Sequence, residues 1–217
     1  TQVGRTFEKD VEAAIAAAYP SLNLAQAATV GARRAADNAA VVDVVRALAA
    51  GEARVLFQPR LAVGLGDWQV TGDIDILRLD RDAAGELRVL IADTKTSTAA
   101  RVEHRLQVAF YHAMLSRLLG EAGLPPASVE IGVLYRGPVE GEGHAAPDPA
   151  VDLTAQRGAA RERLGVENAY LEVLSAADAQ AFLDTVSDLV SAPDSTAARV
   201  ADTPFDDLPF HLTYKCD

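Results

Sequence analysis

The chain has 217 residues and a formal net charge of −11, with 20 Lys and Arg against 31 Asp and Glu. This acidic balance excludes a protein that coats nucleic acid through bulk positive charge, but it leaves room for a local basic cleft. A single cysteine excludes an internal disulfide and fits a reducing compartment, so we expect a cytoplasmic protein.

The apolar content and length are those of an ordinary globular chain. With 49% apolar and 24% charged residues, residues 1–217 are predicted to form one domain. The longest uncharged stretch, residues 13–32, contains Pro20 and several polar side chains, which argues against a membrane span. Since the sequence opens at Thr1 and stops just after Cys216, we expect a fragment of a longer protein, truncated near Cys216.

Hydrophobic periodicity predicts an α/β fold, in which helices flank a mixed central β-sheet. In chain order, the predicted elements are helices over 4–19 (ended by Pro20) and 25–50, strands over 53–63, 68–79 and 87–95, a helix over 101–119, a strand over 128–137, a loop over 137–149 and a helix over 176–192. Short turns join the first three strands, so we expect them to form an antiparallel meander. The helix between the third and fourth strands predicts a parallel crossover.

Acidic side chains and one lysine gather on the second and third predicted strands. Residues two apart in a strand share a face, so we expect Asp73 and Asp75 on one side of the second strand, and Asp93 and Lys95 on one side of the third. If these strands pair, three carboxylates converge and repel one another. Mg²⁺ or Mn²⁺ relieves this repulsion, because hard divalent cations prefer carboxylate oxygens.

The alternative is an ordinary strand end with a salt bridge, because the pattern D-x-K also arises by chance in a chain with 31 acidic residues. Its occurrence after Gly72-x-x-Asp75, on adjacent strands in that order, favours the metal site. Such a metal lowers the pKa of bound water and stabilises charge on a phosphoryl oxygen. Lys95 is placed to hold a phosphate or to orient the attacking water.

The helix predicted over 101–119 adds hydrogen-bonding groups beside that site. Gln107 and Tyr111 lie one turn apart on the same face. They flank an apolar line that is predicted to pack on the sheet: Leu106, Phe110, Met114 and Leu118. An amide and a phenol there can donate hydrogen bonds to a phosphate or a base, whereas the alternative is a partly buried tyrosine beside a solvent-facing glutamine.

The same helix is locally basic in an acidic chain. Between residues 95 and 117 the local charge is +3 with histidines neutral, from Lys95, Arg101, Arg105 and Arg117 against Glu103. A basic helix beside an acidic metal site suits an anionic polymer that needs both a phosphate contact and a metal. The alternative is a merely solvated helix face.

Taken in order, these short motifs resemble the PD-(D/E)xK nuclease superfamily, and most closely its RecB-like branch. The resemblance covers residues 4–136 and rests on three ordered motifs: Gly72-x-x-Asp75, Asp93-x-Lys95 and Gln107-x-x-x-Tyr111. It implies a restriction-endonuclease-like core with a mixed sheet flanked by helices.

The resemblance also implies residue roles. Asp75, Asp93 and the Thr94 backbone carbonyl would hold Mg²⁺ or Mn²⁺, with Lys95 beside the attacking water. Glu8 would be a further ligand, because Gly4-x-x-x-Glu8 matches the branch's G-x-x-x-H pattern with a carboxylate in place of the histidine. Asp73 would lie outside the ligand set. The substrate-binding residues would be Gln107, Tyr111, Arg101 and Arg105.

The expected activity is metal-dependent hydrolysis of phosphodiester bonds in DNA, as an exonuclease of repair, recombination or defence, in a longer protein with a helicase or other partner domain. The residues alone leave exo- or endonucleolytic cleavage, single or double strands, and RNA open. "YKCD" resembles the start of a C-terminal iron–sulfur group, but one cysteine cannot hold a cluster, so a cluster is expected only in a longer chain. The alternatives are a non-catalytic nucleic-acid-binding module of a helicase or repair assembly, and an interaction domain with coincidental motifs.

Overall fold

The computed structural model describes residues 2–25, 36–137 and 151–204. The strands are β1 (Ser21–Asn23), β2 (Ala53–Phe57), β3 (Arg60–Leu65), β4 (Trp68–Asp73), β5 (Ile76–Arg81), β6 (Leu87–Lys95), β7 (Ser128–Tyr135) and β8 (Tyr170–Val173). The helices are α1 (Gln2–Ala18), α2 (Asn38–Ala47), α3 (Val102–Glu121), α4 (Leu153–Leu164), α5 (Ala176–Val186), the π-helical turn η2 (Ser187–Ser191) and α6 (Thr196–Asp202). Among these residues, no helix is long and apolar enough to cross a membrane.

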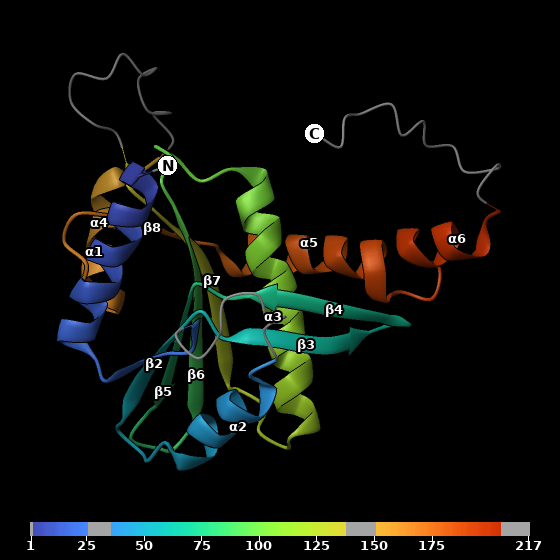
Figure 1. Ribbon diagram of the computed structural model, residues 1–217, viewed down its shortest axis with the longest axis horizontal. Coiled ribbons are helices and arrows are strands. Elements are labelled where there is room, and N and C mark those ends of the chain that lie inside the picture. Colours follow the sequence, from blue (N-terminus) through green and yellow to red (C-terminus); the bar gives the residue numbers. More distant parts are fainter. Residues whose placement is uncertain (1, 26–35, 138–150, 205–217) are drawn as a thin grey trace.

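Six strands form one mixed sheet in the order β1-β2-β5-β6-β7-β8, and β3 and β4 form a separate two-stranded hairpin (Figure 1). β2, β5 and β6 pair antiparallel, which confirms the predicted meander within this sheet. β6 and β7 pair parallel across α3, as the crossover predicts. The predicted α/β class with a mixed central sheet is therefore confirmed.

Helices cover both faces of the sheet. One apolar cluster joins α1 and α4 to the face that carries Val55, Ile76 and Leu90. The other joins α2, α3 and α5 to the opposite face, which carries Leu77 and Ile91. β6 is buried on both faces because neighbouring strands and helices surround it, and so its run of Val, Leu, Ile and Ala reads as uniformly apolar.

The two strands predicted over 53–63 and 68–79 are each broken in two, and this correction matters for the site. Pro59 cannot donate to a strand ladder, and Gln58 has φ 53°, so β2 ends at Phe57 and the chain leaves the sheet. The return break falls at Ile74 and Asp75, between β4 and β5. The segments between the breaks pair as the β3–β4 hairpin, whose buried residues pack on α3.

Other elements differ from the prediction in extent. The helix predicted over 176–192 is α5 followed by η2. Of the helix predicted over 25–50, the described residues form a helix only over Asn38–Ala47 (α2). Residues 26–35 lie outside the described residues, as do 138–149 of the predicted loop and Cys216. The elements β1, α4, β8 and α6 were not predicted, because β1 and β8 are very short and α4 buries only Ala160 and Leu164.

Candidate active site

The carboxyl end of β6 places an acid and a base side by side. The Asp93 side chain is 1% exposed and its Oδ2 lies 2.7 Å from Nζ of Lys95, whose side chain is 26% exposed. Both residues share the face of β6 that looks toward α3, because side chains two apart in a strand point the same way. A buried carboxylate with a partly exposed lysine partner is therefore fixed at the carboxyl end of this central strand.

Asp75 reaches this pair from the break between β4 and β5. Its backbone carbonyl accepts a hydrogen bond from the Gln58 amide at 3.1 Å, and the neighbouring Ile74 amide donates to the Pro59 carbonyl at 3.0 Å. These two bonds join the two segments of the chain at the point where both leave the main sheet. The Asp75 carboxylate then accepts a bond from the Thr94 amide at 2.8 Å, which ties it to β6 beside Asp93.

Asp73 does not share a strand face with Asp75, contrary to the prediction. It is the last residue of β4, whereas Asp75 follows the break in the loop before β5. Its Oδ2 forms an ion pair with Nη1 of Arg60 at 3.1 Å across the hairpin. Asp73 therefore anchors the base of the β3–β4 hairpin, and its place outside the ligand set stays a prediction.

The proximity of Asp75 and Asp93 disfavours two negative charges. Burial and then the charge of Asp93 raise the pKa of Asp75 to about 7, although the Thr94 amide and Lys95 oppose the rise. Burial also raises the pKa of Asp93, against the effect of the Lys95 ammonium. Two carboxyls that resist joint ionisation are the arrangement that a cation relieves.

The donor set fits a hard divalent cation. Asp93 Oδ1 is buried and accepts no hydrogen bond from the described part of the chain, so it is an oxygen still in need of a partner. Asp75 and Asp93 contribute carboxylates, the ligands that Mg²⁺ combines with retained waters. Within the same described residues, no cluster of three or more His, Cys, Asp or Glu side chains is arranged to hold a metal. The carboxylates that the structure brings together there are those of Asp75 and Asp93.

Two acids of α1 act on this pair through their charge. Glu8 contributes to the raised pKa of Asp93. Glu12, one turn later, has a raised pKa from burial and then from the charge of Glu8, and Asp75 adds to it. Glu12 was missed at the sequence level, although its spacing from Glu8 on one helix face would have indicated it. Glu8 as a metal ligand stays a prediction.

Gln107 and Tyr111 of α3 form the far wall of the site. Gln107 Nε2 donates to the Tyr111 hydroxyl at 2.7 Å, so the phenol keeps its own proton to donate. Burial, followed by the charges of Asp93 and Asp75, raises the pKa of Tyr111 to about 12, and this keeps it protonated. The predicted apolar line is partly right, since Met114 and Leu118 are buried while Leu106 and Phe110 are only half-buried.

Gly72 explains how the hairpin and α3 fit together. A Cβ at Gly72 would lie 2.7 Å from Cε1 of the Tyr111 ring, closer than carbon atoms can approach. The ring thus occupies the space that the glycine leaves. The first and third of the three motifs are in direct contact, and the second lies beside them on β6.

The comparison with known proteins agrees with this geometry. A family profile of the PD-(D/E)XK nuclease superfamily matches residues 3–217. This chain belongs to the PD-(D/E)XK nuclease superfamily. A search of curated proteins gives no match. Membership supports phosphodiester hydrolysis of the nuclease type as the general activity, and nucleic acid as the general partner.

The basic residues of this nuclease-superfamily chain are only partly open to a substrate. Arg105 Nε and Nη2 donate to the two carboxylate oxygens of Glu172 on β8, at 2.6 and 3.2 Å. Arg101 is 67% exposed, 3.7 Å from Glu103. Burial and then the nearby Lys95 lower the pKa of His104, so it adds little positive charge. Arg101 and Arg105 as substrate ligands stay predictions, and Arg105 would first have to leave Glu172.

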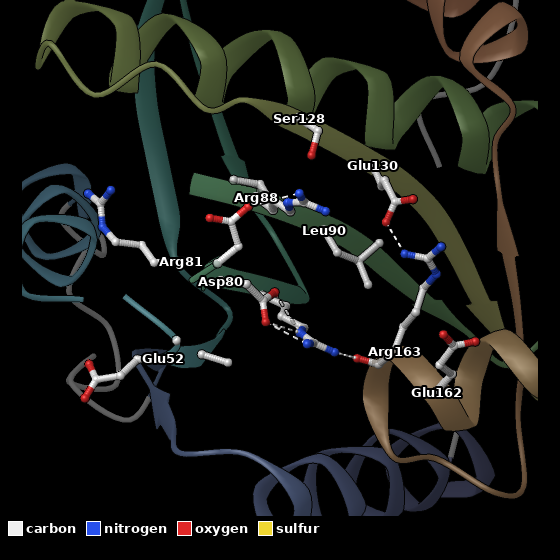
Figure 2. A pocket seen from close by; sticks show the side chains of 14 residues that line it. Glu52, Asp80, Arg81, Arg88, Leu90, Ser128, Glu130, Glu162 and Arg163 are labelled. Carbon is white, nitrogen blue, oxygen red and sulfur yellow. Dashed lines mark hydrogen bonds and ion pairs between the residues drawn. The ribbon is translucent and has the colours of Figure 1, made fainter. Parts of the chain in front are cut away.

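A cavity of about 560 Å³ lies elsewhere in this nuclease-superfamily fold, at the starts of β6 and β7 (Figure 2). Three of its four arginines are paired with acids, as Arg78–Asp80, Arg88–Asp82 and Arg163–Glu130, and Arg81 donates to the Gly85 and Val45 carbonyls. Arg78 also donates to the Arg163 carbonyl at the end of α4. Because these charges are mutually neutralised, the cavity is a structural junction between α4 and the sheet, at the opposite end of β6 from Asp93.

Proposed function

We propose that this chain is a divalent-metal-dependent deoxyribonuclease of the RecB-like branch, with its active site at Asp75, Asp93 and Lys95. The observation that carries the proposal is a pair of adjacent carboxyls, the partly buried Asp75 and the buried Asp93, of which Asp93 has one unpartnered oxygen and contacts a lysine. A purely structural salt bridge would need only Asp93 and Lys95. The second carboxyl, held beside them by the Thr94 amide, adds an electrostatic cost that a bound cation would relieve.

Mg²⁺ or Mn²⁺ is the expected cofactor. Asp75, Asp93 and the Thr94 carbonyl would hold it, with Glu8 as a further carboxylate from α1. When bound, such a metal lowers the pKa of water and stabilises charge that develops on a phosphoryl oxygen. The protein's own contribution is to pre-arrange these oxygens at the end of a buried strand.

Lys95 is the group that prepares the attacking water. Its side chain is partly exposed to solvent, while its partner Asp93 is buried. The lysine can therefore face the solvent side of the site. In that position it donates to the water or to a non-bridging phosphate oxygen. Gln107 and the Tyr111 hydroxyl lie on the α3 side and supply neutral hydrogen-bond donors to the phosphate or base.

We propose exonucleolytic cleavage, in repair, recombination or defence against foreign DNA, within a longer cytoplasmic protein that includes a helicase or another domain. The acidic overall charge supports the need for such a domain, because a chain with net charge −11 holds DNA weakly on its own. The rival function, a non-catalytic nucleic-acid-binding module, would not need Asp75, Asp93 and Lys95 together.

End-labelled single- and double-stranded DNA tests the proposal, incubated with Mn²⁺, Mg²⁺ or EDTA. We expect cleavage that requires the metal and that is lost in Lys95→Ala. Arg88→Ala is the matched control, because it removes a positive charge at the opposite end of the same strand. A stepwise product ladder would support an exonuclease and give its polarity. Cleavage that persists in EDTA, or in Lys95→Ala, would refute the proposed site.

A further inference from the structure

A row of side chains leads from the candidate active site across the sheet. Lys95 of β6 is in register with Tyr135 of β7, and Tyr135 is in register with Tyr170 of β8. Strands in a sheet are spaced by about 4.8 Å, so Tyr170 lies about 10 Å from Lys95 along this row. That distance corresponds to about three nucleotides at the stacked spacing of a nucleic-acid strand.

Tyr170 is held as a rigid aromatic platform. Its ring stacks on Tyr135 with centroids 5.7 Å apart and planes 21° apart. A Cβ at Gly137 would fall 2.1 Å from the Tyr170 ring, so the ring lies against the glycine backbone. Tyr135 in turn is fixed to α4 by the hydrogen bond between its hydroxyl and Gln156. The ring orientation is therefore set by the fold.

Beside this platform lies a cavity of about 320 Å³ with a basic wall. Its lining includes Tyr170 together with Arg157 and Arg161, two exposed arginines one turn apart on the same face of α4. Arg157 Nε donates to the Glu167 carbonyl at 3.1 Å, which orients that guanidinium. Glu167 is the one acid among the lining residues, so the lining has a net positive charge in a strongly acidic chain.

Gly158 lines the same cavity from the middle of α4. A Cβ there would meet nothing within 4 Å, so no packing contact requires a glycine. Glycine inside a helix is destabilising relative to alanine. At this position it leaves the cavity without a side chain from the middle of α4.

We propose that this cavity is a second nucleic-acid subsite that holds the single-stranded end of a substrate, an inference that rests on the proposed nuclease function. An unpaired base stacks on the Tyr170 ring, and Arg157 and Arg161 each bind one of the two neighbouring phosphates. Stacking of this kind accepts any base but requires it to be unpaired. The 560 Å³ cavity at the other end of the sheet offers no such site, because three of its four arginines are paired with acids and its lining carries five acidic residues.

Binding in EDTA tests the subsite without any need for catalysis. The fluorescence anisotropy of a labelled oligothymidylate is measured against wild type, Tyr170→Leu, Gly158→Met and the double variant Arg157→Gln/Arg161→Gln. We expect Tyr170→Leu to weaken binding by about fivefold to 150-fold, the range for loss of base–aromatic stacking. For the double variant, the slope of log K against log salt should fall by about 1.4, the value for two phosphate contacts to a single strand.

Gly158→Met separates binding from folding. Methionine is a good helix former and its side chain would fill the cavity floor, so this variant should unfold at the same or a higher temperature and yet bind the oligonucleotide more weakly. Arg46→Gln/Arg88→Gln is the charge-matched control, with both arginines more than half exposed and outside this cavity. Equal weakening by this control, or binding by all three cavity variants within twofold of wild type, would overturn the proposal.

A small substrate keeps this inference distinct from the nuclease proposal. Thymidine 5′-(p-nitrophenyl phosphate) reaches the metal site but is too short to reach Tyr170. With Mn²⁺, the cavity variants should hydrolyse it as fast as wild type, while their KM for the oligonucleotide rises. If wild type hydrolyses neither substrate, the nuclease proposal fails for this chain, and the anisotropy result still decides whether the subsite exists.

Discussion

Replacement of Asp75 by Asn should stabilise the metal-free protein at alkaline pH. The pKa of Asp75 is raised from 3.8 to about 7 by burial and by Asp93. The charged form is therefore the unfavourable one: its cost is absent below pH 4, grows between pH 4 and 7, and is fully present above pH 7. At 1.36 kcal/mol per pKa unit, the difference between 3.8 and about 7 gives an upper limit of about 4 kcal/mol.

Asp75→Asn removes this charge and keeps an oxygen to accept the Thr94 hydrogen bond. Urea unfolding in EDTA at several pH values from 4 to 8 measures the effect. We expect the variant to match wild type at the acid end and to exceed its free energy of unfolding by up to about 4 kcal/mol at pH 8. An Asn variant that is less stable than wild type at pH 8 would refute the reasoning.

Asp82→Asn is a control that should change the free energy of unfolding in the opposite direction. The backbone amides of Glu86 and Ala84 lower the pKa of Asp82. A lowered pKa contributes stability that is present at neutral pH and is lost on acidification. Asp82→Asn should therefore destabilise the protein by the same amount from pH 8 down to about pH 4, and the loss should fade only below that, as the pH falls through the lowered pKa. A pH dependence of the same sign in both variants would show that bulk charge, not the local environment, controls the effect.

Three further predictions concern the walls of the site. Gly72→Ala should lower the free energy of unfolding by about 1–3 kcal/mol in urea titrations, because its Cβ overlaps the Tyr111 ring, and a change below 0.5 kcal/mol would contradict that contact. Tyr111→Phe keeps the ring and removes the donor, so kcat/KM on DNA should fall by about 10-fold to 100-fold with little loss of stability. Glu8→Gln should raise the Mn²⁺ concentration for half-maximal cleavage by about 10-fold to 100-fold, and an unchanged requirement would exclude Glu8 from the metal's surroundings.

The sequence contained enough to predict the buried strand over 87–95 and the helix after it. Val89 to Ala92 form an apolar run that ends in Asp93-x-Lys95, and such a run is long enough to identify a central strand without tertiary information. The pairing with a strand before and after it followed from the short turn and the crossover helix. Asp93 and Lys95 were therefore correctly placed on one face at the end of this strand.

The location of Asp75 could not be predicted in the same way. Residues 53–63 and 68–79 each have a continuous strand pattern. Only the structure, with the left-handed conformation of Gln58 before Pro59, shows that both strands are interrupted at positions that lie opposite each other. Pro59 was the available signal, since proline does not fit a central strand. The stacked pair Tyr135 and Tyr170 and the helix α4 were missed, because β8 is four residues long and α4 has no wide apolar stripe.

Calorimetric titration of Mn²⁺ into the metal-free protein tests most directly whether Asp75 and Asp93 share a cation. We expect wild type to bind Mn²⁺, and Asp75→Asn and Asp93→Asn each to bind it at least about 10-fold more weakly. Lys95→Ala should bind at least as tightly as wild type while failing to cleave DNA, because it loses a competing positive charge 2.7 Å from Asp93. Equal binding by wild type and both Asn variants, or none by wild type, would contradict a metal site at the end of β6.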